Sequence, residues 1–431
     1  MKKVFALMLA VLVALASVGC ASNSSSNHPI SNSTSDATSS LENSVDPKDT
    51  PHKIGVVEIA TGNAIAISEQ YFSEYLAPYY NCEFVFSEAC STADDVITFM
   101  ENCADMGVEA IICNYNYDTE QLTQKAADLG MYFCENLNRN ATSEAAYTGG
   151  YDNFCGTFAA NQASVATLFH DWIVDTLDTS EEHGFIVTSG WAYRGNEQHV
   201  KITEAMLNAL QEVYGLTYDE EIEDYLSASS PVHATNDKGI EIYIYPDSFL
   251  ADGWVQGFSS ELQSGKYDYV LAAMTVVGYC NVAIDEVERA YNKNITVASF
   301  AALGESLTTS FETADIFGNK SVDFASVKYN TLVSAISFIQ VYNALTGYYD
   351  CLLDKNGEVQ ELTFSMSGAA TLEDLAIMNH WDQGDGTGKW VGHTQFIDSC
   401  LGMNNPSLTG EQIQANVAAM VYENIKAVLE Q

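Results

Sequence analysis

Beginning at Lys53, the chain alternates short apolar runs with longer segments that have the spacing of helices. Strands of about 4–8 residues separated by helices of about 10–15 residues are typical of βαβ units, whose strands lie parallel. The runs that predict strands are 53–60, 82–88, 108–113, 131–136, 184–189, 241–247, 267–274 and 295–301. The segments that predict the helices between them are 65–76, 93–106, 119–129, about 157–177, 196–214, 251–264 and 282–291.

These units form two series, separated near residues 146–153, where a glycine-containing segment precedes a long predicted helix. Each series has too few predicted strands to form one large sheet but enough to form a small sheet of its own. We therefore predict an α/β protein with two doubly wound, Rossmann-like lobes, each a parallel sheet with helices on both faces.

The end of the chain predicts a helical extension. Further elements are expected at 322–327 and 361–366 (strands) and at about 329–346 (a helix), whereas 370–408 has no clear pattern. Thr409 and Gln412 have the spacing of a capping box. One apolar helical face then follows, formed by Ile413, Val417, Met420, Val421, Ile425 and Val428. We expect this face to pack on the protein's own core.

The N-terminus predicts export. Lys2 and Lys3 precede an apolar run, 4–15, that is too short to span a membrane, and small residues then lead to Cys20. This junction resembles the lipobox of bacterial lipoproteins, which implies a signal peptide over 1–20 and lipid on Cys20; a plain secretory signal is the alternative. Residues 21–52 are rich in Ser, Asn and Thr and predict a disordered tether. We expect an extracytoplasmic protein held on the bacterial cell membrane by its lipid alone.

The net charge of the chain excludes one class of function, and the positions of its cysteines indicate the state of their thiols. Lys and Arg number 17 and Asp and Glu 58, for a net charge of −41, so binding to nucleic acid is excluded as a function. Besides Cys20 there are nine cysteines, and several end apolar runs, which favours buried thiols. One or two disulfides remain an alternative.

Ligands of open parallel sheets bind outside the carboxyl ends of the strands, so the loops after the strands are the candidate site. Only three arginines occur in the chain, and two of them, Arg139 and Arg194, fall in these loops. Guanidinium groups suit paired hydroxyls or carboxylates, amides suit sugar hydroxyls, and aromatic rings stack on sugar rings. The predicted ligand-binding residues are Thr61, Asn63, Asn114, Tyr115, Asn138, Arg139, Trp191, Tyr193, Arg194, Thr275 and Lys328.

Several segments together resemble the type I solute-binding proteins of bacterial ABC importers, near the ribose- and galactose-binding branch. KIGVVEIATGN (53–63) resembles the family's first strand and ligand loop, and NLNRN (136–140) resembles the segment with its Asp-Arg pair. YTGGYDNFCGTFAA (147–160) and TSGWAYRGNEQHVKITEAML (188–207) resemble the exit from the first lobe and the opening of the second. The resemblance covers roughly residues 53–366 and implies three crossing strands as a hinge, for which 146–153, 322–328 and 361–366 are candidates.

The resemblance also implies lobe boundaries. We assign 53–150 with about 323–360 to the N-lobe, 151–322 with about 361–369 to the C-lobe, and 370–431 to an extension beyond the family's usual end. The sequence departs from the family at Asn63, where an aromatic pair is usual, and at Asn138, where the family has its Asp. These changes imply a neutral-to-basic polar pocket.

The predicted function is therefore capture of a small polar solute, a sugar or a sugar-like molecule, for an ABC permease. A sensor that presents its ligand to a receptor is the first alternative, and a surface glycan hydrolase is the second. No motif for a cofactor, for zinc or for nucleophilic catalysis occurs. Asp354, Asn356, Glu358 and Gln360 alternate as calcium ligands do, but an ordinary turn explains them equally well.

Overall fold

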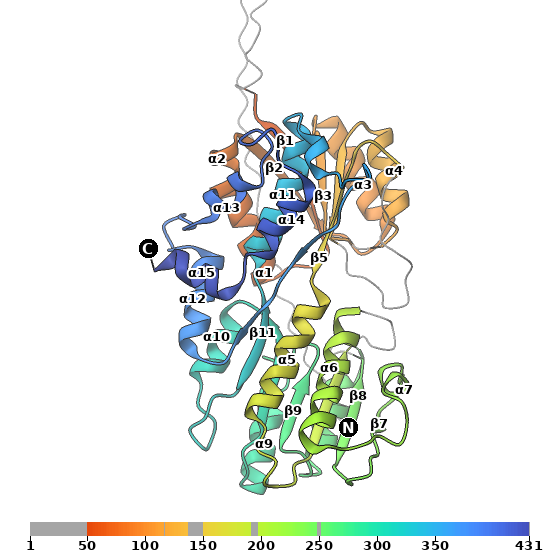
Figure 1. Cartoon of the computed structure of the whole chain (residues 1–431), viewed down its shortest axis with the longest axis vertical. Helices are drawn as coiled ribbons and strands as arrows, with labels where there is room; N and C mark the ends of the chain where they lie inside the picture. The colour runs from red at the N-terminus through yellow and green to blue at the C-terminus, as the bar shows by residue number, and fades with distance from the viewer. Residues whose placement is uncertain (1–49, 116, 137–149, 191–196, 248–250, 431) are drawn as a thin grey trace, which may run out of the picture. The chain divides into compact units, whose positions relative to one another are not determined.

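The computed structural model describes residues 50–115, 117–136, 150–190, 197–247 and 251–430 (Figure 1). The described chain contains two sheets with helices packed on them, which confirms the predicted fold class. No helix in these ranges is both long enough and apolar enough to cross a bilayer.

The first sheet is wholly parallel, with the strand order β12-β5-β4-β3-β1-β2. Its strands are β1 (His52–Glu58), β2 (Cys82–Ala89), β3 (Ala110–Cys113), β4 (Tyr132–Asn136), β5 (Phe154–Ala160) and β12 (Leu362–Phe364). Side chains of β1 alternate between two apolar clusters, because Val56 belongs to one cluster and Val57 to the other. A strand that is buried on both faces needs a continuous apolar run. Such a run is visible in the sequence, and it predicted this strand correctly.

Helices cover both faces of this sheet. They are α1 (Asn63–Gln70), the π-helical turn η2 (Tyr71–Leu76), α2 (Ala77–Tyr80), α3 (Ala93–Asp105), α4 (Thr119–Asp128) and α11 (Asn330–Leu345). Helix α11 packs on β3, β4 and β5, and its side chains from Asn330 to Ala344 are all buried. Helix α3 begins at a capping box in which Thr92 and Asp95 bond each other's backbone N–H.

The second sheet has the order β13-β11-β10-β9-β6-β8-β7 and is parallel except for its two edge strands. Its strands are β6 (Phe185–Gly190), β7 (Val232–His233), β8 (Ile242–Pro246), β9 (Tyr269–Ala272), β10 (Thr296–Ala302), β11 (Phe324–Lys328) and β13 (Ser367–Ala369). Its helices are α5 (Gln162–Thr176), α6 (Glu197–Tyr214), α7 (Ile222–Leu226), α8 (Trp254–Leu262), α9 (Asn281–Tyr291) and α10 (Glu305–Glu312). Helices α5 and α6 lie side by side, as Figure 1 shows.

The strand β5 differs from the expectation, because residues 157–160 were predicted to begin a helix. All seven residues of β5 are buried between β4 and β12, and the helix begins only at Gln162, after Asn161 accepts the N–H of Ser164. A short apolar run that is buried on every side has no periodicity to distinguish a strand from a helix. At Gly156, φ is +104° and an added Cβ would lie 2.5 Å from the carbonyl oxygen of Gln360, so this strand needs glycine there.

The position of β5 shifts the lobe boundaries. Strands β5 and β12 belong to the first sheet, whereas the predicted ranges placed both in the C-lobe. Strand β11 belongs to the second sheet, although 323–360 was assigned to the N-lobe. The chain therefore passes between the sheets at 160–162, 328–330 and 364–367. The first of these lies after the predicted crossing at 146–153, of which residues 146–149 are outside the described residues.

The C-terminal extension contains α12 (Leu372–Gln383), α13 (His393–Ser399), α14 (Gly410–Ala418) and α15 (Tyr422–Leu429). The capping box of Thr409 and Gln412 is confirmed. The single predicted helix after it is wrong, because Val421 adopts an extended conformation and starts α15 as a new helix.

The extension contacts elements that pack on both sheets. The Tyr71 hydroxyl is 2.8 Å from Nδ1 of His393, which ties η2 to α13. In the other direction, Asn379 of α12 donates to the Thr308 hydroxyl of α10 at 3.1 Å.

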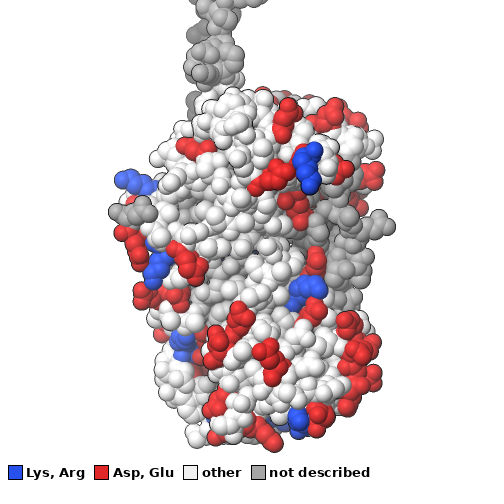
Figure 2. Space-filling view, viewed as in Figure 1, with Lys and Arg blue, Asp and Glu red and all other residues white. Residues whose placement is uncertain are grey.

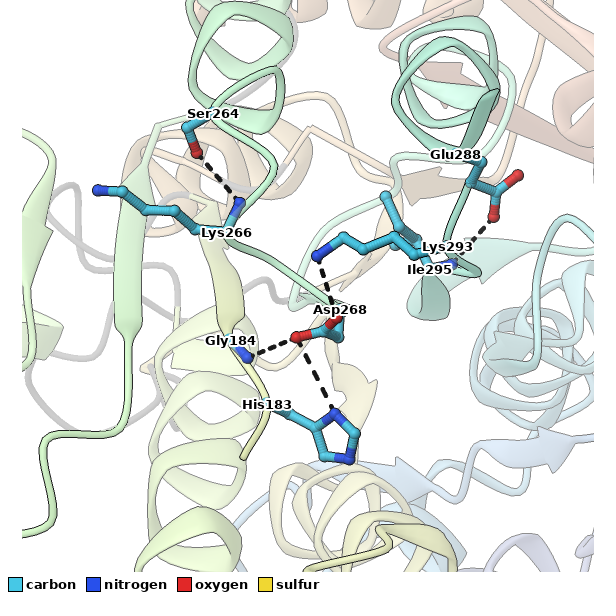
Figure 3. Close-up of polar contacts among 8 residues, drawn as sticks. All are labelled: His183, Gly184, Ser264, Lys266, Asp268, Glu288, Lys293 and Ile295. Carbon is cyan, nitrogen blue, oxygen red and sulfur yellow. Dashed lines mark hydrogen bonds and ion pairs between the residues drawn. The ribbon is translucent and has the colours of Figure 1, made fainter. Parts of the chain in front are cut away.

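A charged group ties together the starts of three strands in the second sheet (Figure 3). Asp268, just before β9, accepts the N–H of Gly184 at 2.8 Å and the ammonium of Lys293 at 3.0 Å. Glu288 accepts the N–H of Ile295, just before β10, at 3.0 Å. Because these groups lie at the amino ends of the strands, they stabilise the sheet and are remote from the ligand edge.

All nine cysteines in the described ranges are free and buried. The structure thus agrees with the interpretation of these residues as buried thiols.

Candidate functional site

A cavity of about 340 Å³ opens where the carboxyl ends of strands from both sheets meet the three crossings. This volume lies within the range of small-molecule sites, which are about 300–1,000 Å³. The strand ends supply Glu58, Asn114, Asn136 and Phe300, and the crossings supply Ala160, Gln162, Lys328, Asn330 and Phe364. Helices α1, η2, α6 and α11 supply the rest: Ala64, Ile65, Ser68, Phe72, Gln198, His199, Val333, Ser334 and Ser337, while Ile59 follows β1.

Three hydrogen-bonded polar side chains lie at the carboxyl ends of strands β1, β3 and β4 in the first sheet. Asn136 donates to Oδ1 of Asn114 at 3.3 Å, and Asn114 donates to Oε2 of Glu58 at 3.3 Å. Burial raises the pKa of Glu58 to about 7, with a further rise from Glu69, whereas Asn114 and Lys328 act to lower it. A carboxyl that changes charge near neutral pH therefore faces the cavity.

Lys328 brings a positive charge into the same cavity from the end of β11. No hydrogen bond or ion pair joins its ammonium to any residue that the structure describes. Burial lowers the pKa of Lys328, while the charges of Glu58 and Asp382 act to raise it. An ammonium has three donors, so this group is available to an acceptor on a ligand.

The remaining walls are polar but uncharged, or aromatic. The Oε1 atom of Gln162 is buried and accepts no hydrogen bond within the described ranges, so it is an acceptor without a donor. Burial lowers the pKa of His199 to about 4, which keeps this imidazole neutral at physiological pH. Phe72, Phe300 and Phe364 add flat apolar faces suited to the C–H surface of a ring. Such a site matches a small molecule with several hydroxyl groups.

Of the predicted ligand residues, Asn114 and Lys328 line the cavity. Thr61, Asn63, Tyr115 and Thr275 are described and are not part of its lining. The amide of Asn63 lies against Gly304, where an added Cβ would be 2.8 Å from Nδ2, so this side chain contacts the loop before α10. Asn138, Arg139, Trp191, Tyr193 and Arg194 lie outside the described residues, as does Cys20.

Several lining residues were not predicted. Glu58 and Asn136 are polar residues at the ends of otherwise apolar runs, and this signal is visible in the sequence. Gln162 and Asn330 each follow a crossing, and no local pattern reveals that position. They could be found only after β5 and β11 were assigned to different sheets.

No protein-family model matches the chain, and no curated protein sequence matches it. Solved structures do. One is an ABC transporter solute-binding protein of Bacillus halodurans with bound myo-inositol, at 17% identity and a TM-score of 0.52, over 77% of this chain and 98% of that one. Another, of Actinobacillus succinogenes with bound D-allose, has 11% identity and a TM-score of 0.52, over 75% and 99%. A Mycobacterium smegmatis protein in complex with β-D-fucofuranose has 12% identity and a TM-score of 0.50, over 75% and 92%.

The fold is that of the type I solute-binding proteins. This result confirms the resemblance stated from the sequence as far as the architecture is concerned. The solute-binding fold accounts for nearly all of each similar chain, whereas about a quarter of the present chain lies outside the match.

Proposed function

We propose that this protein captures a small polyhydroxylated solute, a sugar or a cyclitol, and delivers it to an ABC permease. The observation that carries this proposal is the cavity at the crossings, where the Lys328 ammonium and the amide oxygen of Gln162 have no hydrogen-bond partner among the described residues. A buried polar group without a partner costs free energy, and a ligand with several hydroxyls supplies both kinds of partner.

The similar structures support the same class of ligand. The three similar structures named above hold myo-inositol, D-allose and β-D-fucofuranose. Each is a small ring that bears hydroxyl groups, and the amides and phenyl rings of this cavity suit such a molecule.

Hydrolysis of glycans is not favoured by the cavity. Glycosidases of the common types place two carboxyl groups on either side of the bond that is cleaved. Among the lining residues that the structure describes, Glu58 is the only carboxyl. We therefore propose binding without chemical conversion.

The sequence supports a membrane-anchored location. The signal-like start, Cys20 and the polar segment 21–52 fit a lipoprotein whose binding domain is tethered outside the cytoplasm. A tethered binder remains close to a permease in the same membrane, which raises its effective concentration there.

A ligand screen by thermal shift tests the proposal. The panel contains myo-inositol, D-allose, common hexoses and pentoses, with amino acids and nucleosides as controls. A ligand present at 100 times its dissociation constant adds about 2.7 kcal/mol to the free energy of unfolding. Calorimetry should then show saturable binding to one site, and chromatography should recover the ligand unchanged. Stabilisation by amino acids or nucleosides alone, or conversion of a sugar to product, would contradict the proposal.

A further inference from the structure

Two opposite charges enter the cavity from different sheets. Glu58 ends β1 in the first sheet, and Lys328 ends β11 in the second. The charge of Lys328 lowers the pKa of Glu58, and the charge of Glu58 raises the pKa of Lys328, yet the two groups form no ion pair. A carboxylate and an ammonium that line one cavity without forming an ion pair can each bind a different atom of a ligand.

The groups around Glu58 and Lys328 determine which ligand atoms these two residues can bind. Asp382 of α12 is the second acid that acts on Lys328, but its oxygens already accept from Nδ2 of Asn330 and the N–H of Thr331 at 2.8 Å each, and from the Thr331 hydroxyl at 2.9 Å. Glu58 faces the amide of Asn114 and the charge of Glu69 on α1. Asp382 is therefore committed to α11, and the donors of Lys328 remain for a ligand.

Among the residues that the structure describes, the charges near the cavity are not net positive. One ammonium faces Glu58 and Asp382, and Glu69 adds a third carboxyl near Glu58. The imidazole of His199 adds no positive charge, because it is neutral at physiological pH. Figure 2 also shows many acidic and few basic side chains on the visible face. An anionic ligand would therefore be repelled by these described carboxyls and, in solution, by the acidic protein as a whole.

Resting on the function proposed above, we propose that Glu58 and Lys328 together hold two hydroxyl oxygens of a neutral polyol and make the protein reject acidic sugars. One hydroxyl donates its hydrogen to the Glu58 carboxylate, and an oxygen close to it accepts from the Lys328 ammonium. Both contacts are charge-assisted, and loss of either hydroxyl leaves a buried charged group unpaired. Specificity then comes from this pair of residues on two separate strands.

This arrangement makes binding depend on pH, because the ionised form of Glu58 accepts the hydroxyl hydrogen in a charge-assisted bond, whereas the protonated form is a weaker acceptor. Burial and the charge of Glu69 on α1 raise the pKa of Glu58 to about 7, while Asn114, just after β3, and Lys328, at the end of β11, act to lower it. At pH 6 about a tenth of the free sites are then ionised, and at pH 8 about nine tenths. Affinity for a neutral polyol should therefore increase by up to about tenfold between these pH values.

The test compares sugars in matched pairs by calorimetry at pH 6 and pH 8: D-glucose with D-glucuronate, D-galactose with D-galacturonate, and myo-inositol and D-allose alone. We expect the neutral members to bind and each acid to bind at least about tenfold more weakly than its neutral partner. Tighter binding of an acid would overturn this inference and leave the proposed function standing. Failure of every sugar and cyclitol to bind would overturn both.

Variants of the same size separate the pair's role from folding. Glu58→Gln and Lys328→Met should each weaken binding of the neutral ligand about tenfold or more, and Glu58→Gln should also abolish the pH dependence. Glu69→Gln is the matched control, because it removes only the charge that raises the pKa of Glu58. It should shift the pH midpoint of binding downward and leave affinity at pH 8 unchanged. Unchanged affinity in Glu58→Gln, or a pH profile that Glu69→Gln does not move, would overturn the inference.

Discussion

Asp382 of the C-terminal extension accepts the backbone N–H of Thr331, the second residue of α11, at 2.8 Å. It accepts the Thr331 hydroxyl as well, while Tyr329, the residue that precedes α11, offers no capping side chain. The extension thus caps the helix that follows the second crossing. The charge of the same carboxylate raises the pKa of Lys328, which lines the ligand cavity. Asp382 therefore links the extension to the cavity.

Asp382→Ala should destabilise the fold by about 2–4 kcal/mol, because the change leaves buried donors on Asn330 and Thr331 without an acceptor. Urea denaturation monitored by circular dichroism measures this loss. Asp385→Ala, in the exposed turn after α12, is the control and should change stability little. Equal effects of the two changes would show that the cap contributes nothing.

Stability without ligand should fall as pH rises from 6.5 to 8. Burial raises the pKa of Glu135 to about 8 and that of Glu288 to about 7, above the ordinary value of 4.5. In the unfolded chain both groups are already ionised throughout this window, whereas the folded protein must lose protons, so the stabilisation decreases with pH. His199 and His393 oppose the trend in part, because burial lowers their pKa values from 6.5 to about 4 and about 3, so they are neutral when folded while the unfolded imidazoles still bind some proton near pH 6.5. Their contribution over this window is smaller than that of the two carboxyls, so the net slope stays downward.

Thermal unfolding at pH 6.5, 7.2 and 8 measures this dependence. Glu135→Gln keeps the size of the side chain and removes its titration, so it should flatten the profile and raise stability most at pH 8. Exposed Glu120→Gln, in the first turn of the neighbouring α4, is a control that should leave the slope unchanged. A parent protein whose unfolding temperature increases over this window would contradict the assigned burial effects.

Arg139 remains our prediction for a ligand contact from the loop after β4. Arg139→Ala should fold normally and bind the ligand about 10- to 150-fold more weakly, because a charge-assisted hydrogen bond contributes about 1.5–3 kcal/mol. Calorimetry with the ligand found in the screen measures the change. Arg289→Ala, at the C-terminal turn of α9, is the matched control and should bind as the parent does. Normal binding by Arg139→Ala would move the prediction to Arg194 and Trp191.

Cys20→Ser should release the protein from the membrane fraction, because acyl chains contribute about 0.8 kcal/mol for each buried CH₂ and no other anchor is expected. Fractionation of cells followed by immunoblotting shows the distribution. Cys82→Ser, at a buried thiol in β2, controls for the loss of a cysteine as such and should remain with the membrane. Retention of Cys20→Ser on the membrane would contradict lipidation at this residue.

Much of the site depends on positions that no short segment of sequence reveals. Asn114 was predicted because it directly follows an apolar run, and the structure places it in the cavity. Gln162 was not predicted, because residues 157–160 were expected to be helical and the first crossing was expected at 146–153, before its actual position at 160–162. Asp382 lay in a stretch without a clear pattern, and its contact with Thr331 joins residues far apart in the chain.

The amino-acid sequence alone was sufficient to predict the elements whose signals are local. The alternation of strands and helices, the two series of βα units and the capping box at Thr409 all depend on residues a few positions apart, where side-chain period and hydrogen bonding act directly. The assignment of β5 and β12 to the first sheet and of β11 to the second became apparent only in the folded protein. That choice is made by burial and strand pairing between distant segments, and it alone brings Glu58 and Lys328 to one cavity.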